Sequence, residues 1–176
     1  MGTGNLKRDA LIQAGFDVTS VAFDDDAAAG WQDLFKAPLR NLFPIVFMLK
    51  QSRQIYSKWV AEAQAAYDSL QPDLVVGSSR GGSVAMTMQV ADDVPVILLA
   101  PAYKWFGWIG GSTSTKHPNV TVVHSSQDET IPFAESEELC RNCPQVKLIE
   151  AGSDHSLNTP EGTAVWVKAA RDLIAR

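Results

Sequence analysis

Short apolar runs alternate with stretches of helical spacing along most of the chain. Apolar runs typical of strands buried on both faces of a sheet lie at residues 94–100 and 120–124, and further strands are predicted at residues 73–76 and 146–150. Apolar residues recur at helical spacing over residues 6–14, 52–70, 133–139 and 163–174. A further helix is predicted directly after the first strand. This order predicts an α/β fold with three layers, a mostly parallel central sheet flanked by helices.

Two segments near the start depart from this alternation. Residues 16–23 alternate between apolar and polar positions and predict a strand, and the acidic residues 24–26 predict a solvated loop after it. Residues 27–51 are rich in large apolar side chains and are interrupted by Pro38 and Pro44, which indicates a cap-like or lid-like insertion. Such an insertion can pack on the core, form a wall of a substrate pocket or provide a dimer surface.

An aromatic-rich segment follows the apolar run at residues 94–100. It carries Trp105, Phe106 and Trp108 and leaves the end of a central strand, where ligand sites gather in open α/β sheets. We therefore expect these three side chains to line a substrate pocket. A purely structural aromatic cluster is the alternative.

The composition narrows the class of protein. A chain of 176 residues with 45% hydrophobic residues predicts a single domain over residues 1–176 with a sizeable core. A net charge of −5 with no cluster of Lys or Arg disfavours a nucleic-acid or anionic-membrane partner. No apolar run is long enough for a signal core or a bilayer span, so we expect a cytoplasmic protein.

The two cysteines, Cys140 and Cys143, form a C-x-x-C pair. A redox role requires such a pair at a helix N-terminus, whereas this pair closes a late helix just before Pro144. A single pair also cannot complete a four-cysteine zinc site. We expect reduced thiols, and no metal or organic cofactor.

A sharp turn connects the first buried strand to its helix. Gly77-Ser78-Ser79-Arg80-Gly81 fits the G-x-S-x-G nucleophile elbow, which holds its central serine, here Ser79, in a strained conformation at the tip of a strand. The glycines two before and two after the serine are expected to crowd each other across the turn. The N–H of Arg80, at the start of the helix, is placed to donate to an oxyanion. Ser78 and Ser83 are rival hydroxyls, but neither lies between correctly spaced glycines.

Two further chemical groups follow later strands. Asp128 lies in a loop after the strand at 120–124, and His155 lies in the loop after the strand at 146–150. Because the carboxyl ends of parallel strands meet at one edge, Ser79, Asp128 and His155 are predicted to lie together there, in an order that allows nucleophilic catalysis. Asp128 could instead cap the next helix, with Glu129 as a rival carboxylate. Among the other histidines, His117 precedes a strand and lies at the wrong end.

These motifs together resemble the α/β-hydrolases, in particular the compact single-domain serine hydrolases and esterases. In that family the acid follows an H-G-x-x-D-x-x-V-P pattern, which residues 124–132 match with Ser125 in place of the glycine and Ile131 in place of the valine. The resemblance extends over nearly the whole chain. It implies that His124 is structural and that Asp128 and His155 complete a catalytic triad with Ser79. We expect Asp154, beside His155, to face solvent.

The resemblance also implies a second oxyanion donor from an early glycine-containing loop. Gly2-Thr3-Gly4 matches that loop, which makes Thr3 the candidate donor beside Arg80. The strand that precedes the loop in the family has no counterpart here. Either the true start lies upstream, or the fold lacks its usual first strands and a homo-oligomer covers the exposed edge.

We expect a serine hydrolase that cleaves an ester or thioester of a small apolar acyl group through an acyl-enzyme on Ser79. Its partner would then be a small-molecule acyl substrate. Two alternatives remain open at the level of sequence: a non-catalytic binding protein of the same fold, and a peptidase of the same fold. A dinucleotide-binding enzyme is disfavoured, because the early glycines lack a preceding strand and the third glycine of that fingerprint.

Overall fold

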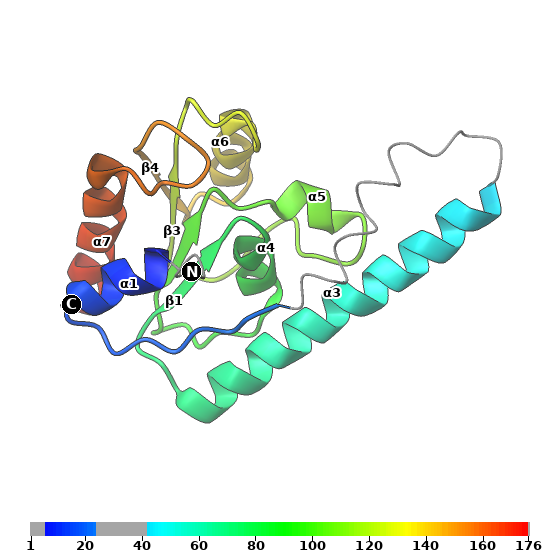
Figure 1. Ribbon diagram of the computed structural model, residues 1–176, viewed down its shortest axis with the longest axis horizontal. Coiled ribbons are helices and arrows are strands. Elements are labelled where there is room, and N and C mark those ends of the chain that lie inside the picture. The colour runs from blue at the N-terminus through cyan, green and yellow to red at the C-terminus, as the bar shows by residue number, and fades with distance from the viewer. Residues whose placement is uncertain (1–5, 24–41, 176) are drawn as a thin grey trace, which may run out of the picture.

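The structure is a computed structural model that describes residues 6–23 and 42–175, and for residues 42–49 it describes the backbone alone. Its centre is a parallel sheet in the order β1-β2-β3-β4 (Figure 1). The strands are β1 (Val75–Ser78), β2 (Val96–Leu99), β3 (Val120–His124) and β4 (Lys147–Glu150). All three pairings are parallel, so the four carboxyl ends lie at one edge. The four predicted strands and the α/β class are confirmed.

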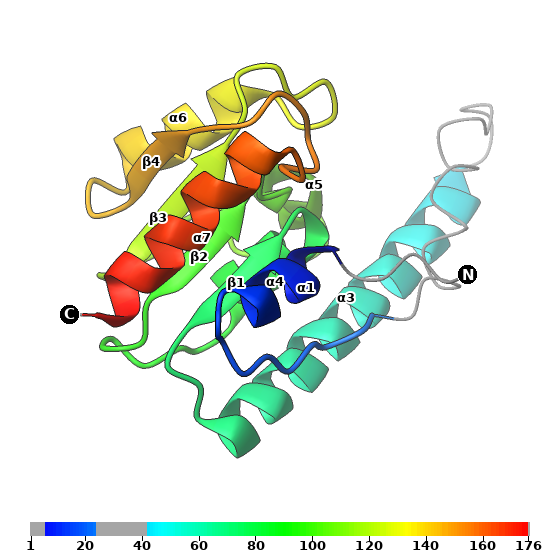
Figure 2. The same ribbon diagram turned by 60° about the vertical axis from the view of Figure 1, so that its left-hand side comes forward.

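Helices cover both faces of this sheet (Figure 2). One face packs against α4 (Arg80–Thr87), α5 (Tyr103–Gly107) and α6 (Phe133–Asn142) around buried Leu98 and Val122. The other face packs against α1 (Leu6–Gln13) and α7 (Pro160–Ile174) around Ile97, Leu99 and fully buried Trp166. Adjacent residues of β2 thus enter opposite cores, which is why its sequence is apolar without interruption.

The long helix α3 (Leu42–Leu70) packs on the outside of α4, and its first turns extend beyond the sheet (Figure 1). Tyr56 anchors it, because its hydroxyl lies 2.9 Å from Ser83 Oγ and 2.8 Å from Thr87 Oγ1, both on α4. Pro44 falls in the first turn, where no intrahelical N–H is needed. No helix in the described residues, α3 included, is both long and apolar enough to cross a membrane.

The predicted insertion at residues 27–51 is described only in part. Residues 27–41 lie outside the described residues, and residues 42–51 form the beginning of α3 rather than a separate element. A cap over a substrate pocket therefore stays a prediction for this segment.

The predicted strand at residues 16–23 is wrong, because this segment is extended but belongs to no ladder. Phe16 and Val18 pack into the core beside α7, while Phe23 packs with the residues of α3 and α4. The segment therefore passes from one side of the sheet to the other. The alternation corresponds to partial burial at Phe16 and Val18, whereas Val21 is exposed, so the pattern arises here without a hydrogen-bonded neighbour.

Candidate active site

The backbone of Ser79 is held in an unusual conformation, with φ of 51° and ψ of −114°. Its N–H donates to Leu99 O at 2.8 Å, and its own carbonyl accepts from Gly82 N at 3.0 Å and Ala102 N at 3.1 Å. Hydrogen bonds from β2, from α4 and from the segment after β2 thus fix a residue that is strained on its own. The serine stands at the tip of β1, as the elbow motif predicts.

The glycines of the elbow have different roles. A Cβ on Gly77 would lie 2.5 Å from Gly81 O, so the predicted crowding is confirmed at that position. A Cβ on Gly81 would meet only the Phe23 ring, at 3.9 Å, so the crowding expected there is wrong. Gly82, which the motif does not include, is the second constrained glycine, because a Cβ there would lie 2.9 Å from Pro101 Cβ. That contact comes from the loop after β2 and has no local signal in the sequence.

The structure brings Ser79, His155 and Asp128 into one hydrogen-bonded series. His155 Nε2 lies 2.9 Å from Ser79 Oγ, and His155 Nδ1 lies 2.7 Å from Asp128 Oδ2. The Asp128 side chain is fully buried, whereas that of His155 keeps 25% of its surface exposed. A buried acceptor therefore faces one ring nitrogen, and the other faces a hydroxyl near the surface.

Asp128 is held as a carboxylate by donors on both of its oxygens. Oδ1 accepts from Thr130 N at 2.7 Å and Ile131 N at 2.9 Å, so the residue also begins the turn before α6. Oδ2 accepts from His155 and from His124, whose Nε2 lies 2.9 Å away. Burial works to raise the pKa of Asp128, but hydrogen bonds from Ile131, His155 and Thr130 outweigh it and lower the pKa below its usual value. Glu129, the rival carboxylate, is exposed.

Two polar residues that the sequence analysis did not assign a role fasten the loops of the site. Buried Ser125 donates through its hydroxyl to Gly152 O at 3.0 Å and accepts from Gln127 N at 3.1 Å, which connects the Asp128 loop to the His155 loop. Asp154 was expected to face solvent, but its Oδ1 accepts from Ser156 Oγ at 2.9 Å and from Leu157 N at 2.8 Å. No signal in a single sequence distinguishes these contacts from solvated loop positions.

The structure describes only some of the residues that were predicted to form the oxyanion hole and the substrate pocket. Arg80 is the first residue of α4, and its guanidinium lies over the Trp59 ring, 4.6 Å from its centre. Thr3 lies outside the described residues. On α5 and just after it, Trp105 and Trp108 are exposed, whereas Phe106 stacks on Tyr56 of α3 with ring centres 5.4 Å apart. Phe106 thus belongs to a structural cluster, and the pocket role of all three stays a prediction.

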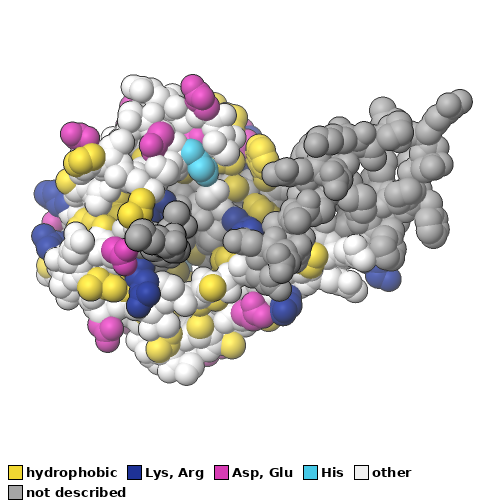
Figure 3. All heavy atoms as spheres, viewed as in Figure 1, with side chains coloured by type: hydrophobic (Ala, Val, Ile, Leu, Met, Phe, Trp, Pro, Cys, Tyr) yellow, Lys and Arg dark blue, Asp and Glu magenta, His cyan; other side chains and the backbone are white. Residues whose placement is uncertain are grey.

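A polar depression of about 320 Å³ lies beside His155. Besides His155 it is lined by polar or acidic side chains from the two loops that carry the site, namely Gln127, Glu129, Thr130, Ser153, Asp154 and Ser156. Over the face shown in Figure 3, Lys and Arg side chains are scattered among acidic ones and do not form a basic patch. The depression therefore offers hydrogen-bonding groups and negative charge next to His155.

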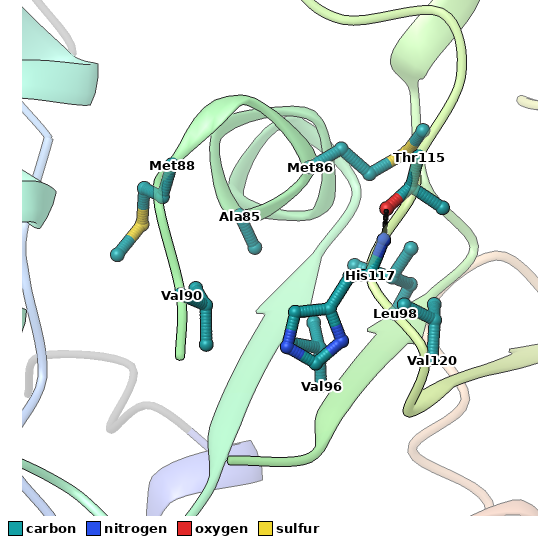
Figure 4. Close-up of a pocket in the computed structure, with 9 residues that line it drawn as sticks. All are labelled: Ala85, Met86, Met88, Val90, Val96, Leu98, Thr115, His117 and Val120. Atoms are coloured by element: carbon teal, nitrogen blue, oxygen red, sulfur yellow. Dashed lines mark hydrogen bonds between the residues drawn. The ribbon is translucent and has the colours of Figure 1, made fainter. Parts of the chain in front are cut away.

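A second hollow lies at the opposite end of the strands (Figure 4). It measures about 20 Å³ and is lined mainly by apolar side chains of α4, β2 and β3, together with Thr115 and His117. His117 Nε2 lies 2.9 Å from Ala91 O. A space of this size holds about one water molecule, so it is a gap in the packing.

In the described part of the chain, the cysteines form no disulfide, and the acidic groups form no metal site. Cys143 is buried, Cys140 is half-buried, and neither is in a disulfide. Burial raises the pKa of Cys140, with a smaller contribution from Cys143, which disfavours its reactive thiolate. Within residues 6–23 and 42–175, no three His, Cys, Asp or Glu side chains are grouped to hold a metal ion.

Comparison with solved structures identifies the fold. A putative hydrolase from Agrobacterium vitis S4 matches with a TM-score of 0.53 and 20% identity over 68% of each chain. Est1E from Butyrivibrio proteoclasticus matches with a TM-score of 0.55 and 18% identity, over 69% of this chain and 72% of that one. A putative hydrolase of the alpha/beta superfamily from Xanthomonas campestris pv. campestris matches with a TM-score of 0.53 and 21% identity, over 99% of this chain and 90% of that one.

The chain thus has the α/β-hydrolase fold, as the resemblance in its motifs predicts. No protein-family model matches the sequence. No curated protein matches it either. At identities of about one in five, the structural likeness establishes the fold, and the activity must be argued from the site.

Proposed function

We propose that the protein is a serine hydrolase that cleaves an ester or thioester of a small apolar acyl group through an acyl-enzyme on Ser79. The observation that carries this proposal is the pair of hydrogen bonds that joins Ser79 Oγ to His155 Nε2 and His155 Nδ1 to Asp128 Oδ2, at 2.9 Å and 2.7 Å. A nucleophile, a base and a group that orients the base are the three parts that activated-serine chemistry requires.

Acylation follows from these contacts. His155 Nε2 takes the proton of the Ser79 hydroxyl as Oγ attacks the acyl carbon, and Asp128 stabilises the imidazolium that forms. The proton on Nε2 then passes to the oxygen or sulfur of the leaving group as its bond to the acyl carbon breaks. The free alcohol or thiol departs and the acyl group stays on Ser79.

Deacylation repeats these steps with water. His155 takes a proton from the water, whose oxygen attacks the acyl carbon, and returns the proton to Ser79 Oγ as the carboxylic acid leaves. In both steps negative charge develops on the former carbonyl oxygen. The N–H of Arg80 and the N-terminal end of α4 are our candidates to stabilise this charge, with Thr3 as the second donor.

The substrate class follows from the surroundings of the hydrogen-bonded residues Ser79, His155 and Asp128. The exposed Trp105 and Trp108 supply apolar surface on the segment after β2, which suits a small apolar acyl group. The polar depression is lined in part by His155, the residue that would protonate the leaving group, which suits a hydrophilic alcohol or thiol. The hydrolase descriptions of the structural neighbours agree with this class of reaction.

Labelling with a fluorophosphonate probe tests the proposal without knowledge of the substrate. We expect peptide mass spectrometry to place the probe on Ser79, and labelling to disappear in Ser79→Ala and His155→Ala. Ser78→Ala is the matched control, since the neighbouring hydroxyl ends β1 and has no base, and it should label as the wild type does. A folded wild-type protein that the probe does not label would favour the non-catalytic binding protein.

A panel of substrates that share one acyl group, but carry it as an ester, a thioester or an amide, distinguishes an esterase or thioesterase from a peptidase. We expect turnover of the ester and thioester and little turnover of the amide. Preferred cleavage of the amide would instead identify a peptidase of this fold.

A further inference from the structure

Hydrogen bonds continue behind Asp128 to a second histidine. His124, at the end of β3, places Nε2 2.9 Å from Asp128 Oδ2 and 3.2 Å from Ile131 O, and its Nδ1 lies 2.7 Å from Ser136 Oγ on α6. The side chains of His124 and Ser136 are fully buried. Five residues from the elbow, the two later loops, β3 and α6 thus form one series that ends at the Ser136 hydroxyl.

The partners of His124 determine its tautomer. Asp128 Oδ2 and Ile131 O can only accept, so Nε2 must carry a proton and donate. A buried neutral ring then presents a lone pair at Nδ1, and the Ser136 hydroxyl is the group that can donate to it. Burial lowers the pKa of His124, and Asp128 offsets this only in part, so the ring stays neutral at physiological pH.

This arrangement makes two histidines share one carboxylate oxygen. Asp128 Oδ2 accepts from His155 Nδ1 at 2.7 Å and from His124 Nε2 at 2.9 Å. A second donor fixes the orientation of the carboxylate and stabilises its negative charge, so that Asp128 attracts the proton of His155 less strongly than it would alone. The acidity of the His155 imidazolium therefore depends on a ring that lies on the far side of Asp128.

We propose that His124 and Ser136 are positioning residues that set the orientation of Asp128 and the pH at which His155 gains its proton. The proposal rests on the proposed function, because the titration of His155 affects turnover only if His155 is the general base. His124 itself transfers no proton. Ser136 acts one step further back, by keeping the proton of His124 on Nε2.

The charges that act on His124 are few. The titratable groups that affect it are Asp128, through its hydrogen bond and its charge, and His155, through its charge. From α6 it meets the neutral Ser136 hydroxyl and the Phe133 ring, whose centre lies 5.6 Å away, and the neighbouring residue on β4 is the exposed Glu150. The protonation of His124 therefore depends on Asp128 and His155 more than on charged groups at the surface.

The chain contains three histidines, so nitrogen NMR of histidine-labelled protein can follow each ring separately. We expect His124 to remain in the neutral Nε2–H form from pH 6 to 8. In His124→Asn, whose shorter amide does not reach Asp128, we expect the midpoint of the His155 titration to rise by about half a pH unit or more. His124→Gln is the matched variant, because its longer amide places an N–H near the position of Nε2 and should restore the wild-type midpoint.

Kinetics provide the second measurement. The acid limb of kcat/KM should move to higher pH in His124→Asn by the same amount as the NMR midpoint, while KM stays within about twofold, because no substrate contact is lost. Ser136→Ala should produce a smaller shift in the same direction. Thr121→Val, a buried substitution at the other end of β3, controls for general loosening of the strand and should leave the midpoint unchanged.

Two results would overturn the proposal. A His155 midpoint in folded His124→Asn equal to that of the wild type would show that His124 only fills space. Equal losses of kcat/KM in His124→Asn and His124→Gln, with no shift of the acid limb, would also show that His124 only fills space. The NMR titration needs no activity, so a protein that shows the coupling but no labelled serine would contradict the proposed function alone.

Discussion

Asp128 is the residue on which the geometry of the site depends most. It is fully buried and accepts hydrogen bonds from two histidine rings and two backbone N–H groups. Each of its two oxygens therefore has a separate task. Oδ1 shapes the turn before α6, and Oδ2 orients the rings.

Replacement of this carboxylate tests its role directly. Asp128→Asn keeps the size of the side chain but can present an N–H where His155 and His124 both need an acceptor, so we expect kcat to fall by at least about 100-fold. Glu129→Gln is the matched control, because the adjacent exposed carboxylate contacts neither ring, and with a neutral substrate its kcat should stay within about threefold. Equal losses in the two variants would show that Asp128 is not the group that orients His155.

The lowered pKa of His124 makes stability depend on pH. The unfolded chain binds a proton at His124 near pH 6.5, whereas the folded protein resists it, so protonation favours unfolding as the pH falls below that value. This contribution is present in full above about pH 6.5 and decreases by about 1.4 kcal/mol per pH unit until the folded pKa is reached. Denaturant unfolding at pH 7.5 and 5.5 should therefore show a larger loss for the wild type than for His124→Asn. Parallel losses in both proteins would contradict this assignment.

Asp128 contributes in the same direction at lower pH. Its folded pKa lies below the unfolded value, so its stabilisation is present above about pH 4 and is lost as the pH falls through the folded pKa. The Asp128 contribution is constant between pH 7.5 and 5.5, which allows the His124 contribution to be read separately over that range.

At the scale of elements, the elbow between β1 and α4 places the site. Its backbone is fixed by hydrogen bonds from Ser79 to β2 and to the segment after it. The turn therefore depends on close approach of the backbone at Gly77, where the neighbouring atoms belong to the main chain and cannot move aside.

Two alanine substitutions test which glycine of the elbow motif is required by steric crowding of the backbone. Gly77→Ala would place a methyl 2.5 Å from Gly81 O, so we expect the free energy of unfolding to fall by about 3 kcal/mol or more. Gly81→Ala has room for its methyl and lies in a helix, so its stability should stay the same or rise by up to about 1 kcal/mol. Chemical denaturation measures both, and similar losses in the two variants would contradict the distinction.

The elements that a single sequence reveals are those whose signals are local. The central strands β2 and β3 were predictable because each is a short apolar run buried on both faces, and the edge that the strands share predicted that Ser79, Asp128 and His155 would lie together. The extended segment at residues 16–23 was mistaken for a strand because alternation reports burial but not a hydrogen-bonded neighbour. Gly82, Ser125 and Ser136 were not assigned roles, since their contacts come from Pro101, Gly152 and His124, which other elements supply.

At the scale of the molecule, the two ends of the sheet differ. The carboxyl edge carries the hydrogen-bonded series and a depression of about 320 Å³, whereas the other end holds a gap of about 20 Å³. Of the four non-glycine residues with positive φ in the described part of the chain, Ser79, Ala100 and Leu157 follow β1, β2 and β4 at the carboxyl edge, whereas Gln71 precedes β1 at the other end. Strained backbone is thus concentrated where the chemistry is proposed.

The acidic lining of the depression predicts a preference for cationic leaving groups. A choline ester and the isosteric neutral 3,3-dimethylbutyl ester of one acid isolate this effect, and we expect a higher kcat/KM for the choline ester. Glu129→Gln should lower that ratio by about threefold, less at high salt, since the carboxylate is exposed. Asp92→Asn, at the opposite end of the sheet, should leave the ratio unchanged. A ratio that is the same in all three proteins would contradict a leaving-group role for the depression.

The most direct test of the central claim is to trap the acyl-enzyme. The protein is mixed with an activated ester of a short-chain acid and quenched in acid within milliseconds, and its peptides are then analysed by mass spectrometry. We predict one acyl group per chain, located on Ser79 and absent from Ser79→Ala. Turnover of the ester with no acyl group on Ser79, or equal acylation of the Ser79→Ala variant, would contradict the account.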